Sequence, residues 1–180
     1  MYDGIRKAVK EATGYDIYIM VESADVWCNQ MRYQYFYMEG CVDAVASRTS
    51  RNMYDQSEMS RSYMYPQMID QNWKYNRETA LPAFGDGSME FVPCVGPAWN
   101  KLVQDGRGSI GNTPIVKKDA ATYRTMCNVA KMNAGRNRLI LIDSYNKYNF
   151  DSFIEPTVEG YGNGYGRTYL DITRQQFKKN

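Results

Sequence analysis

The sequence predicts an α/β protein built from consecutive parallel βα units. Expected helices and strands alternate along the chain in the order α-β-α-β-α-β-α-β-α, which is typical of parallel sheets. The clearest strand, residues 139–142, is apolar without interruption, as in strands covered on both faces. The apolar run ends at Asp143 and is followed by polar and aromatic residues. α/β proteins build their sites at strand ends of this kind. A buried strand followed by an ordinary solvated loop would give the same pattern.

Length and composition restrict the class of protein. The 180 residues suffice for a single domain over residues 1–180, whether or not a longer protein contains it. The net charge of +2 gives no reason to expect a nucleic-acid partner. Histidine is absent, which excludes His-based catalytic triads and His metal ligands. The four cysteines form no C-x-x-C pair, so we expect buried thiols, no metal site and no cofactor.

The sequence gives no sign of a membrane partner. It contains no stretch of about 18 apolar residues, so no membrane-spanning helix is expected. The segment after Met1 is polar and amphipathic and does not resemble a signal peptide, although a fragment would have lost such a signal.

The first half of the chain is predicted to hold two helix–strand pairs. Residues 3–13 form a helix that Gly14 ends, and residues 15–21 form the first strand. Residues 25–37 form an aromatic-rich helix, and residues 42–46 form a short second strand. The apolar face of the first helix consists of Ile5, Ala8, Val9 and Ala12.

The next pair is less regular. Residues 56–81 are predicted to be helical, with Pro66 kinking or dividing the helix. Residues 89–95 form the third strand, and Pro93 within it argues for a strand end or an irregularity.

The last elements are a helix, a strand and a closing helix. The pair Thr113-Pro114 is a favourable helix start, and Gly135 ends that helix. Residues 138–142 form the fourth strand. The closing helix carries Leu170, Thr173 and Phe177 on one face.

Three segments resemble glycoside hydrolases of families 99 and 71. Residues 144–156, SYNKYNFDSFIEP, resemble the last-strand signature S-W-N-E-W-x-E-G-T-x-I-E-P of these enzymes. Residues 93–100, PCVGPAWN, resemble the P-x-V-x-P-G-[FW]-D segment that follows their seventh strand. Residues 165–170, YGRTYL, resemble the Y-G-x-x-Y-L start of their last helix. The resemblance spans roughly the second half of the chain and implies the C-terminal half, strands five to eight, of a (β/α)8 barrel.

The chain departs from this family where catalysis is concerned. The two glutamates of N-E-W-x-E are the residues tied to catalysis in family 99, and Lys147 and Phe150 occupy these positions here. Neither side chain can do the acid–base work of a carboxylate. The resemblance therefore supports the fold better than the activity. It also suggests a secreted, periplasmic or cell-surface protein.

Polar side chains at the strand ends are the candidate site. Glycoside hydrolysis needs two carboxyl groups flanking the scissile bond, and the candidates are Glu22, Asp143 and Glu155. Each has a structural alternative: a solvated loop acid for Glu22, a loop cap for Asp143, and a salt bridge or loop hydrogen bond for Glu155. Amides and aromatic rings suit sugar hydroxyls and sugar faces. The candidate substrate-binding residues are Trp99, Asn100, Tyr145, Asn146, Lys147, Tyr148 and Asn149.

Tyrosine is unusually frequent, with 16 residues in 180. It combines an apolar ring with a hydroxyl, which suits sugar stacking and protein interfaces, but tyrosines on helices also simply pack against a sheet.

Two classes of function follow. One is a glycoside hydrolase or part of one, and the other is a catalytically silent domain that binds glycans or assembles with another half-barrel. In both, an oligosaccharide or polysaccharide is the expected ligand. Because four βα units cannot close a barrel, we also expect either a longer chain that supplies the first four strands or a homo-oligomer.

Overall fold

The structure is a computed structural model that describes residues 2–24, 42–47, 65–83, 87–98, 118–159 and 164–178. Several predictions lie outside these ranges. They are the helix over residues 25–37, residues 56–64 of the predicted helix 56–81, Cys28, Cys41, Trp99, Asn100 and the helix start at Thr113-Pro114.

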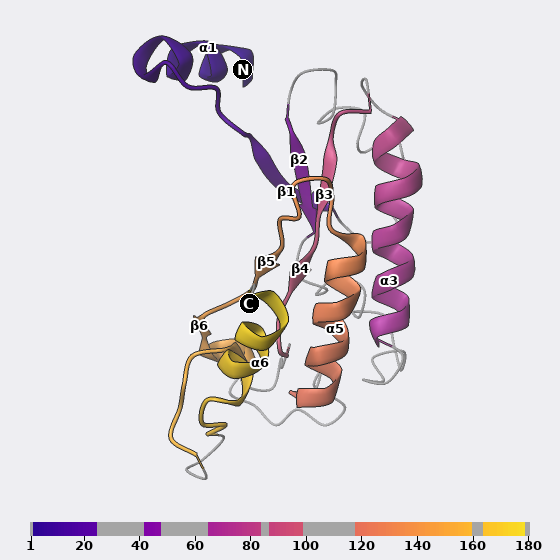
Figure 1. The fold of residues 1–180 in the computed structure, drawn as a ribbon, viewed down its shortest axis with the longest axis vertical. Coiled ribbons are helices and arrows are strands. Elements are labelled where there is room, and N and C mark those ends of the chain that lie inside the picture. The colour runs from indigo at the N-terminus through magenta and orange to yellow at the C-terminus, as the bar shows by residue number, and fades with distance from the viewer. Residues whose placement is uncertain are drawn as a thin grey trace.

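Parallel strands form the centre of the molecule (Figure 1). Strand β1 (Met20–Ala24) pairs in parallel with β2 (Ala44–Ser47), which pairs in parallel with β3 (Glu90–Val92). Strand β4 (Cys94–Val95) pairs in parallel with β5 (Leu141–Ile142). Only Pro93 separates β3 from β4, and its carbonyl accepts a hydrogen bond from Leu141 N at 2.9 Å. The predicted class, an α/β fold of parallel βα units resembling half of a barrel, is confirmed.

Helices cover one face of these strands (Figure 1). Helix α3 (Tyr65–Tyr75) continues through a π-helical turn (Asn76–Ala80) into a 3₁₀ turn (Leu81–Ala83). Helix α5 (Ala120–Asn133) packs beside α3, and α6 (Thr168–Phe177) packs against α5.

The main core lies between the strands and these helices. Val45, Phe91 and Val95 point into it from the strands, and Trp73 of α3 meets the Phe91 ring at 6.2 Å. Side chains alternate across a strand, so the neighbouring residues face the other side. There a smaller cluster forms from Ala44, Ala46 and Val92, with Leu141 against it.

Helix α1 (Tyr2–Thr13) stands apart from the other helices, at the end of an extended segment that leads into β1 (Figure 1). None of its residues is buried. Arg6 connects it to the sheet, because its guanidinium donates to the Asp43 carboxylate at 2.8 Å and to the Ile17 carbonyl at 3.0 Å.

The strand over residues 138–142 is shorter and more exposed than predicted. Only Leu141 and Ile142 pair with a neighbour, both are partly buried, and Leu139 is 41% exposed. The prediction of a strand covered on both faces was wrong, because β5 lies at the edge of the described strands and lacks a second neighbour there. The first strand also begins later than predicted, because the segment before Met20 is extended without ladder pairing.

Helix α5 begins at Ala120, because Asp119 has extended backbone and caps the helix by accepting from Thr122 N at 2.6 Å. The predicted start at Thr113-Pro114 lies outside the described residues. In α6 the fully buried residues are Tyr169 and Ile172, whereas the predicted face is only partly buried.

Cys94 and Cys127 are buried free thiols, as predicted for them. No helix in the described ranges is long and apolar enough to cross a membrane.

Candidate functional site

The segment after β5 is a folded hairpin, whereas the sequence predicted a loop. Strand β6 (Asn146–Lys147) pairs in antiparallel fashion with β7 (Ser152–Phe153) around a 3₁₀ turn (Tyr148–Phe150). The turn closes at Asp151, whose backbone is left-handed with φ 55°. The hairpin holds residues 145–149 in place at the carboxyl end of β5.

Hydrogen bonds fix this hairpin to the residues that directly follow β5. Ser152 Oγ donates to the Asp143 carbonyl at 2.6 Å, and Ser144 Oγ accepts from Lys147 N at 2.9 Å. Gly96 makes the close approach possible, since a Cβ there would collide with the Asp143 carbonyl oxygen and press on Ser152 Oγ. A side chain at position 96 is therefore incompatible with the observed position of the hairpin.

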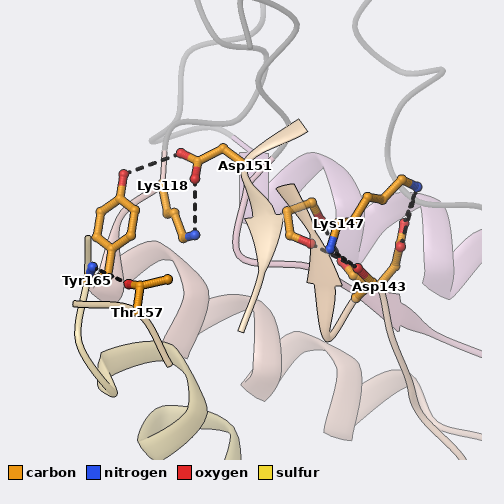
Figure 2. A network of polar contacts seen from close by, with 8 residues as sticks. Lys118, Asp143, Lys147, Asp151, Thr157 and Tyr165 are labelled. Atoms are coloured by element: carbon orange, nitrogen blue, oxygen red, sulfur yellow. Dashed lines mark hydrogen bonds and ion pairs between the residues drawn. The ribbon is translucent and has the colours of Figure 1, made fainter. Parts of the chain in front are cut away.

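Asp143 and Lys147 form an ion pair at the strand end (Figure 2). Lys147 Nζ lies 3.4 Å from one Asp143 carboxylate oxygen and 3.5 Å from the other. The side chains are 34% and 22% exposed, so solvent reaches both. Lys147 Nζ also lies 5.3 Å from the centre of the Phe150 ring, which is itself buried in the core. At the two positions where the family resemblance expects glutamates, this chain therefore has the partly exposed cation Lys147 and the buried ring of Phe150.

Glu22 of β1 belongs to the same electrostatic environment. Burial, together with the negative charges of Asp143 and Glu22, raises the pKa of the Cys94 thiol to about 12, and the positive charge of Lys147 opposes this rise. The charges of Glu22 in β1 and of Asp143 after β5 therefore both act on the Cys94 thiol. Ser47, the last residue of β2, accepts a hydrogen bond from Cys94 N at 2.8 Å and completes this row of strand ends.

The hairpin presents two exposed aromatic rings. Tyr145 is 53% exposed and Tyr148 is 49% exposed, with exposed Asn146 and Asn149 beside them. The Tyr148 ring packs 4.7 Å from Phe153 and its hydroxyl donates to the Glu155 carboxylate, which raises the pKa of Tyr148. Glu155 is thus engaged with an aromatic side chain, in agreement with the structural alternative given for it above.

A second polar cluster, which sequence reasoning did not find, lies on the other side of the hairpin from the Asp143–Lys147 pair (Figure 2). The side chain of Lys118 is 2% exposed, and its ammonium lies 3.1 Å from the Asp151 carboxylate. The same nitrogen lies 3.2 Å from the ring centre of Phe153, 4.3 Å from Tyr165 and 4.9 Å from Tyr169. We call these five residues the lysine cage.

The lysine cage had only a weak signal in the sequence. Tyr165 and Tyr169 stand four residues apart in the segment that resembles Y-G-x-x-Y-L, a spacing that places two rings on one side of a helix start. Nothing in the spacing of Lys118 and Asp151 connects them, because they are 33 residues apart.

The predicted site residues are therefore only partly assembled. Asp143 and Lys147 are in contact, and Glu22 shares their electrostatic environment through Cys94. Glu155 lies instead with Tyr148. Trp99 and Asn100 fall outside the described residues. Within the described ranges no group of three His, Cys, Asp or Glu side chains could hold a metal ion.

Comparison with known proteins supports the fold. No protein-family model and no curated protein matches the sequence. A solved structure described as a "glycoside hydrolase-like protein" matches 99% of this chain with a TM-score of 0.80 and 25% identity. Two structures of the GH99 endo-alpha-mannosidase from Bacteroides thetaiotaomicron match 76% and 77% of the chain at 19% identity, with TM-scores of 0.46 and 0.41.

The chain spans about half the length of these proteins. It covers 49% of the glycoside hydrolase-like protein and 39% and 40% of the two endo-alpha-mannosidase chains. A close structural match over nearly all of this chain and half of the other agrees with the predicted half-barrel.

Proposed function

We propose that this chain is a carbohydrate-active domain that binds a glycan at the carboxyl ends of its strands. The observation that carries the proposal is the pair of exposed rings, Tyr145 and Tyr148, on a hairpin that also presents the Asp143–Lys147 ion pair. Aromatic rings stack on sugar faces, and carboxylates, ammonium groups and amides bind sugar hydroxyls. The structural match to a glycoside hydrolase-like protein supports this class of ligand.

We expect the chain to bind glycans without hydrolysing them by itself. At the two positions where the family resemblance expects glutamates, Lys147 is paired with Asp143 and Phe150 is buried. Loss of a positioned general acid or base reduces the rate by about 10²–10⁴-fold. This supports a glycan-binding role in preference to a catalytic one.

A glycosidase that uses other acids is the alternative. Glu22 and Asp143 both act electrostatically on Cys94, so these two carboxylates face one region from different strands. Glycoside hydrolysis by a carboxylate pair would then survive without the family glutamates. Turnover of an α-mannan or similar glycan that Glu22→Gln or Asp143→Asn abolishes would establish this alternative.

The test is a glycan array, followed by titration of each bound glycan and by a hydrolysis assay on the same set. Tyr145→Ala should weaken binding by about tenfold, the equivalent of ~1.4 kcal/mol, because a stacking ring is lost. Tyr15→Ala is the matched control, since Tyr15 is 77% exposed but precedes β1 at the opposite strand end. Absence of any bound glycan, or equal weakening by both variants, would contradict the proposal.

A further inference from the structure

The lysine cage places a buried cation where the hairpin meets the helical layer. The side chain of Lys118 is 2% exposed and that of Asp151 is 9% exposed, and their charged atoms lie 3.1 Å apart. The same ammonium lies 3.2 Å from the ring centre of Phe153 in β7. In Figure 2 it points toward Asp151, on the side of the hairpin away from the Asp143–Lys147 pair. Lys118 therefore contacts the hairpin without being part of the exposed candidate site.

Both hairpin contacts of Lys118 lead on to Tyr148, one of the two exposed rings of the proposed glycan site. Asp151 closes the 3₁₀ turn, and its amide donates to the Tyr148 carbonyl at 3.0 Å. The centre of the Phe153 ring lies 4.7 Å from the centre of the Tyr148 ring. The cation thus fixes the backbone of Tyr148 through one neighbour and its ring through the other.

The other walls of the cage are anchored in the helical layer. The ring centres of Tyr165 and Tyr169 lie 4.3 Å and 4.9 Å from the ammonium, and the two rings meet edge to face at 5.4 Å. Tyr169 of α6 packs 5.7 Å from the ring of Tyr123 in α5, which is fully buried in the main core. Because aromatic rings attract an ammonium group, this one cation connects the hairpin to the core.

The charge of Lys118 matters because Asp151 is buried as well. Without the ammonium, the Asp151 carboxylate would keep one side-chain hydrogen bond within the described residues, from the Tyr165 hydroxyl at 3.3 Å. A buried charge whose partner has been removed is strongly destabilised. The carboxylate would regain hydration if the turn moved outward, and Tyr148 would then move with it.

We propose that Lys118 is a positioning residue of the glycan site. Its ammonium, paired with Asp151 and surrounded by the rings of the lysine cage, holds the hairpin so that Tyr148 presents its ring to the ligand. The ligand in this inference rests on the proposed function, whereas the position of the hairpin can be tested without any ligand. Lys118 does not contact the glycan itself, because its side chain is buried.

The first test is amide hydrogen exchange, followed by NMR at pH 7, below the pKa of about 8 that burial gives Lys118. In Lys118→Met, the amides of Lys147 and Asp151 should exchange at least about tenfold faster than in the wild type, because the hairpin opens locally to hydrate Asp151. The amides of β2 and β3 should not change, since these strands pair in the central sheet.

A double variant, Lys118→Met with Asp151→Asn, separates charge from packing. Asparagine leaves no unpaired charge, and it tolerates the left-handed backbone of residue 151. If the ion pair holds the hairpin, the double variant should reverse most of the faster exchange that Lys118→Met causes.

Lys131→Met is the matched control. Lys131 of α5 also connects that helix to α6, because its ammonium donates to Gln176 Oε1 at 2.6 Å, but it is not part of the lysine cage. The same substitution at this position should leave the exchange of the hairpin amides unchanged.

The second test titrates the variants with each glycan that the wild type binds on the array. Lys118→Met should weaken binding at least about tenfold, the double variant should recover most of the affinity, and Lys131→Met should bind like the wild type. If the wild type bound no glycan, the proposed function would fail, and the exchange experiment would still decide whether Lys118 holds the hairpin.

Three results would overturn the inference. The first is hairpin exchange in Lys118→Met that does not rise, or that rises equally in β2 and β3 or in Lys131→Met. The second is a double variant whose hairpin exchanges as fast as that of Lys118→Met, which would make Lys118 a packing residue only. The third is unchanged glycan affinity in Lys118→Met, which would show that the position of the hairpin does not control binding.

Discussion

Lys118 places an ammonium group inside a nearly closed aromatic shell. Burial lowers its pKa from 10.5 to about 8, although the Asp151 carboxylate at 3.1 Å favours the charged form. The lysine cage joins the start of α5 to the hairpin and to α6, because Asp151 lies in the hairpin and Tyr169 in the helix. Tyr165 adds a hydrogen bond to Asp151 at 3.3 Å. A single cation therefore holds the candidate site against the helical layer.

The first prediction follows from the lowered pKa of Lys118. The unfolded chain keeps the Lys118 proton up to about pH 10.5, whereas the folded protein releases it near pH 8. Between these values the unfolded state binds more protons, so the free energy of unfolding rises with pH. Relative to Lys118→Met, the wild type should gain about 2 kcal/mol between pH 7 and pH 9.5.

Denaturant unfolding of both proteins across this range measures the difference. The raised pKa values of Tyr165 and Tyr169 lie above it, and the buried thiols contribute equally to both proteins. A difference in unfolding free energy that stays constant with pH would show that Lys118 is not buried as a cation.

At the scale of elements, the hairpin depends on how closely it approaches β4. Gly96 has no side chain where the Asp143 carbonyl and Ser152 Oγ pass. The Asp143 amide donates to the Val95 carbonyl at 2.8 Å, so β5 and the hairpin are fixed to one short stretch of backbone. Movement of that stretch would displace Asp143 and Lys147 together.

Gly96→Ala should therefore lower the free energy of unfolding by about 1–3 kcal/mol, because overpacking forces backbone shifts. It should also weaken glycan binding, since the hairpin must move. Gly4→Ala is the control: a Cβ at Gly4 of α1 meets nothing within 4 Å, and alanine should stabilise the helix by up to about 1 kcal/mol. Thermal unfolding of the two variants would contradict the argument if both lost stability equally.

The elements show what local sequence could and could not predict. The parallel strands and helix α1 followed from periodicity, and the break at Pro93 followed from the missing amide hydrogen. The hairpin over residues 146–153 did not, because its strands have two residues each and are held by Ser144 and Ser152 rather than by an apolar pattern. Its position could be predicted from the strand end, but its shape depends on packing.

The candidate site could also be predicted only in part. Asp143 and Lys147 were found because they follow an apolar strand directly. The lysine cage was not, because its members meet only after α5, the hairpin and α6 have packed together. Contacts between distant residues of this kind leave little trace in a single sequence.

At the scale of the whole molecule, the two ends of the strands carry different kinds of interaction. Exposed aromatics and the Asp143–Lys147 pair lie at the carboxyl ends. At the amino ends, Asp43 accepts from Ile19 N at 2.6 Å as well as from Arg6. In parallel βα proteins the carboxyl ends carry function and the opposite face carries stability.

Glu90, at the start of β3, tests this division. Glu90 is 6% exposed, and its carboxylate accepts hydrogen bonds from the Tyr18 hydroxyl, from Asn137 N at 2.9 Å and from Asn137 Nδ2 at 2.6 Å. Glu90→Gln replaces an acceptor oxygen with a donor facing other donors, which should lower the free energy of unfolding by about 1–3 kcal/mol.

The same variant should leave glycan affinity unchanged, because Glu90 lies at the strand end opposite the hairpin. Asp143→Asn should weaken glycan binding and change the free energy of unfolding by only about 0–1 kcal/mol. Asp143 is partly exposed, and its ion pair with Lys147 is solvated and contributes little to stability. Parallel measurement of urea unfolding and glycan titration on both variants separates the two roles. If Glu90→Gln weakened glycan binding as much as Asp143→Asn, the amino ends of the strands would belong to the binding site, and the division between the two faces would be wrong.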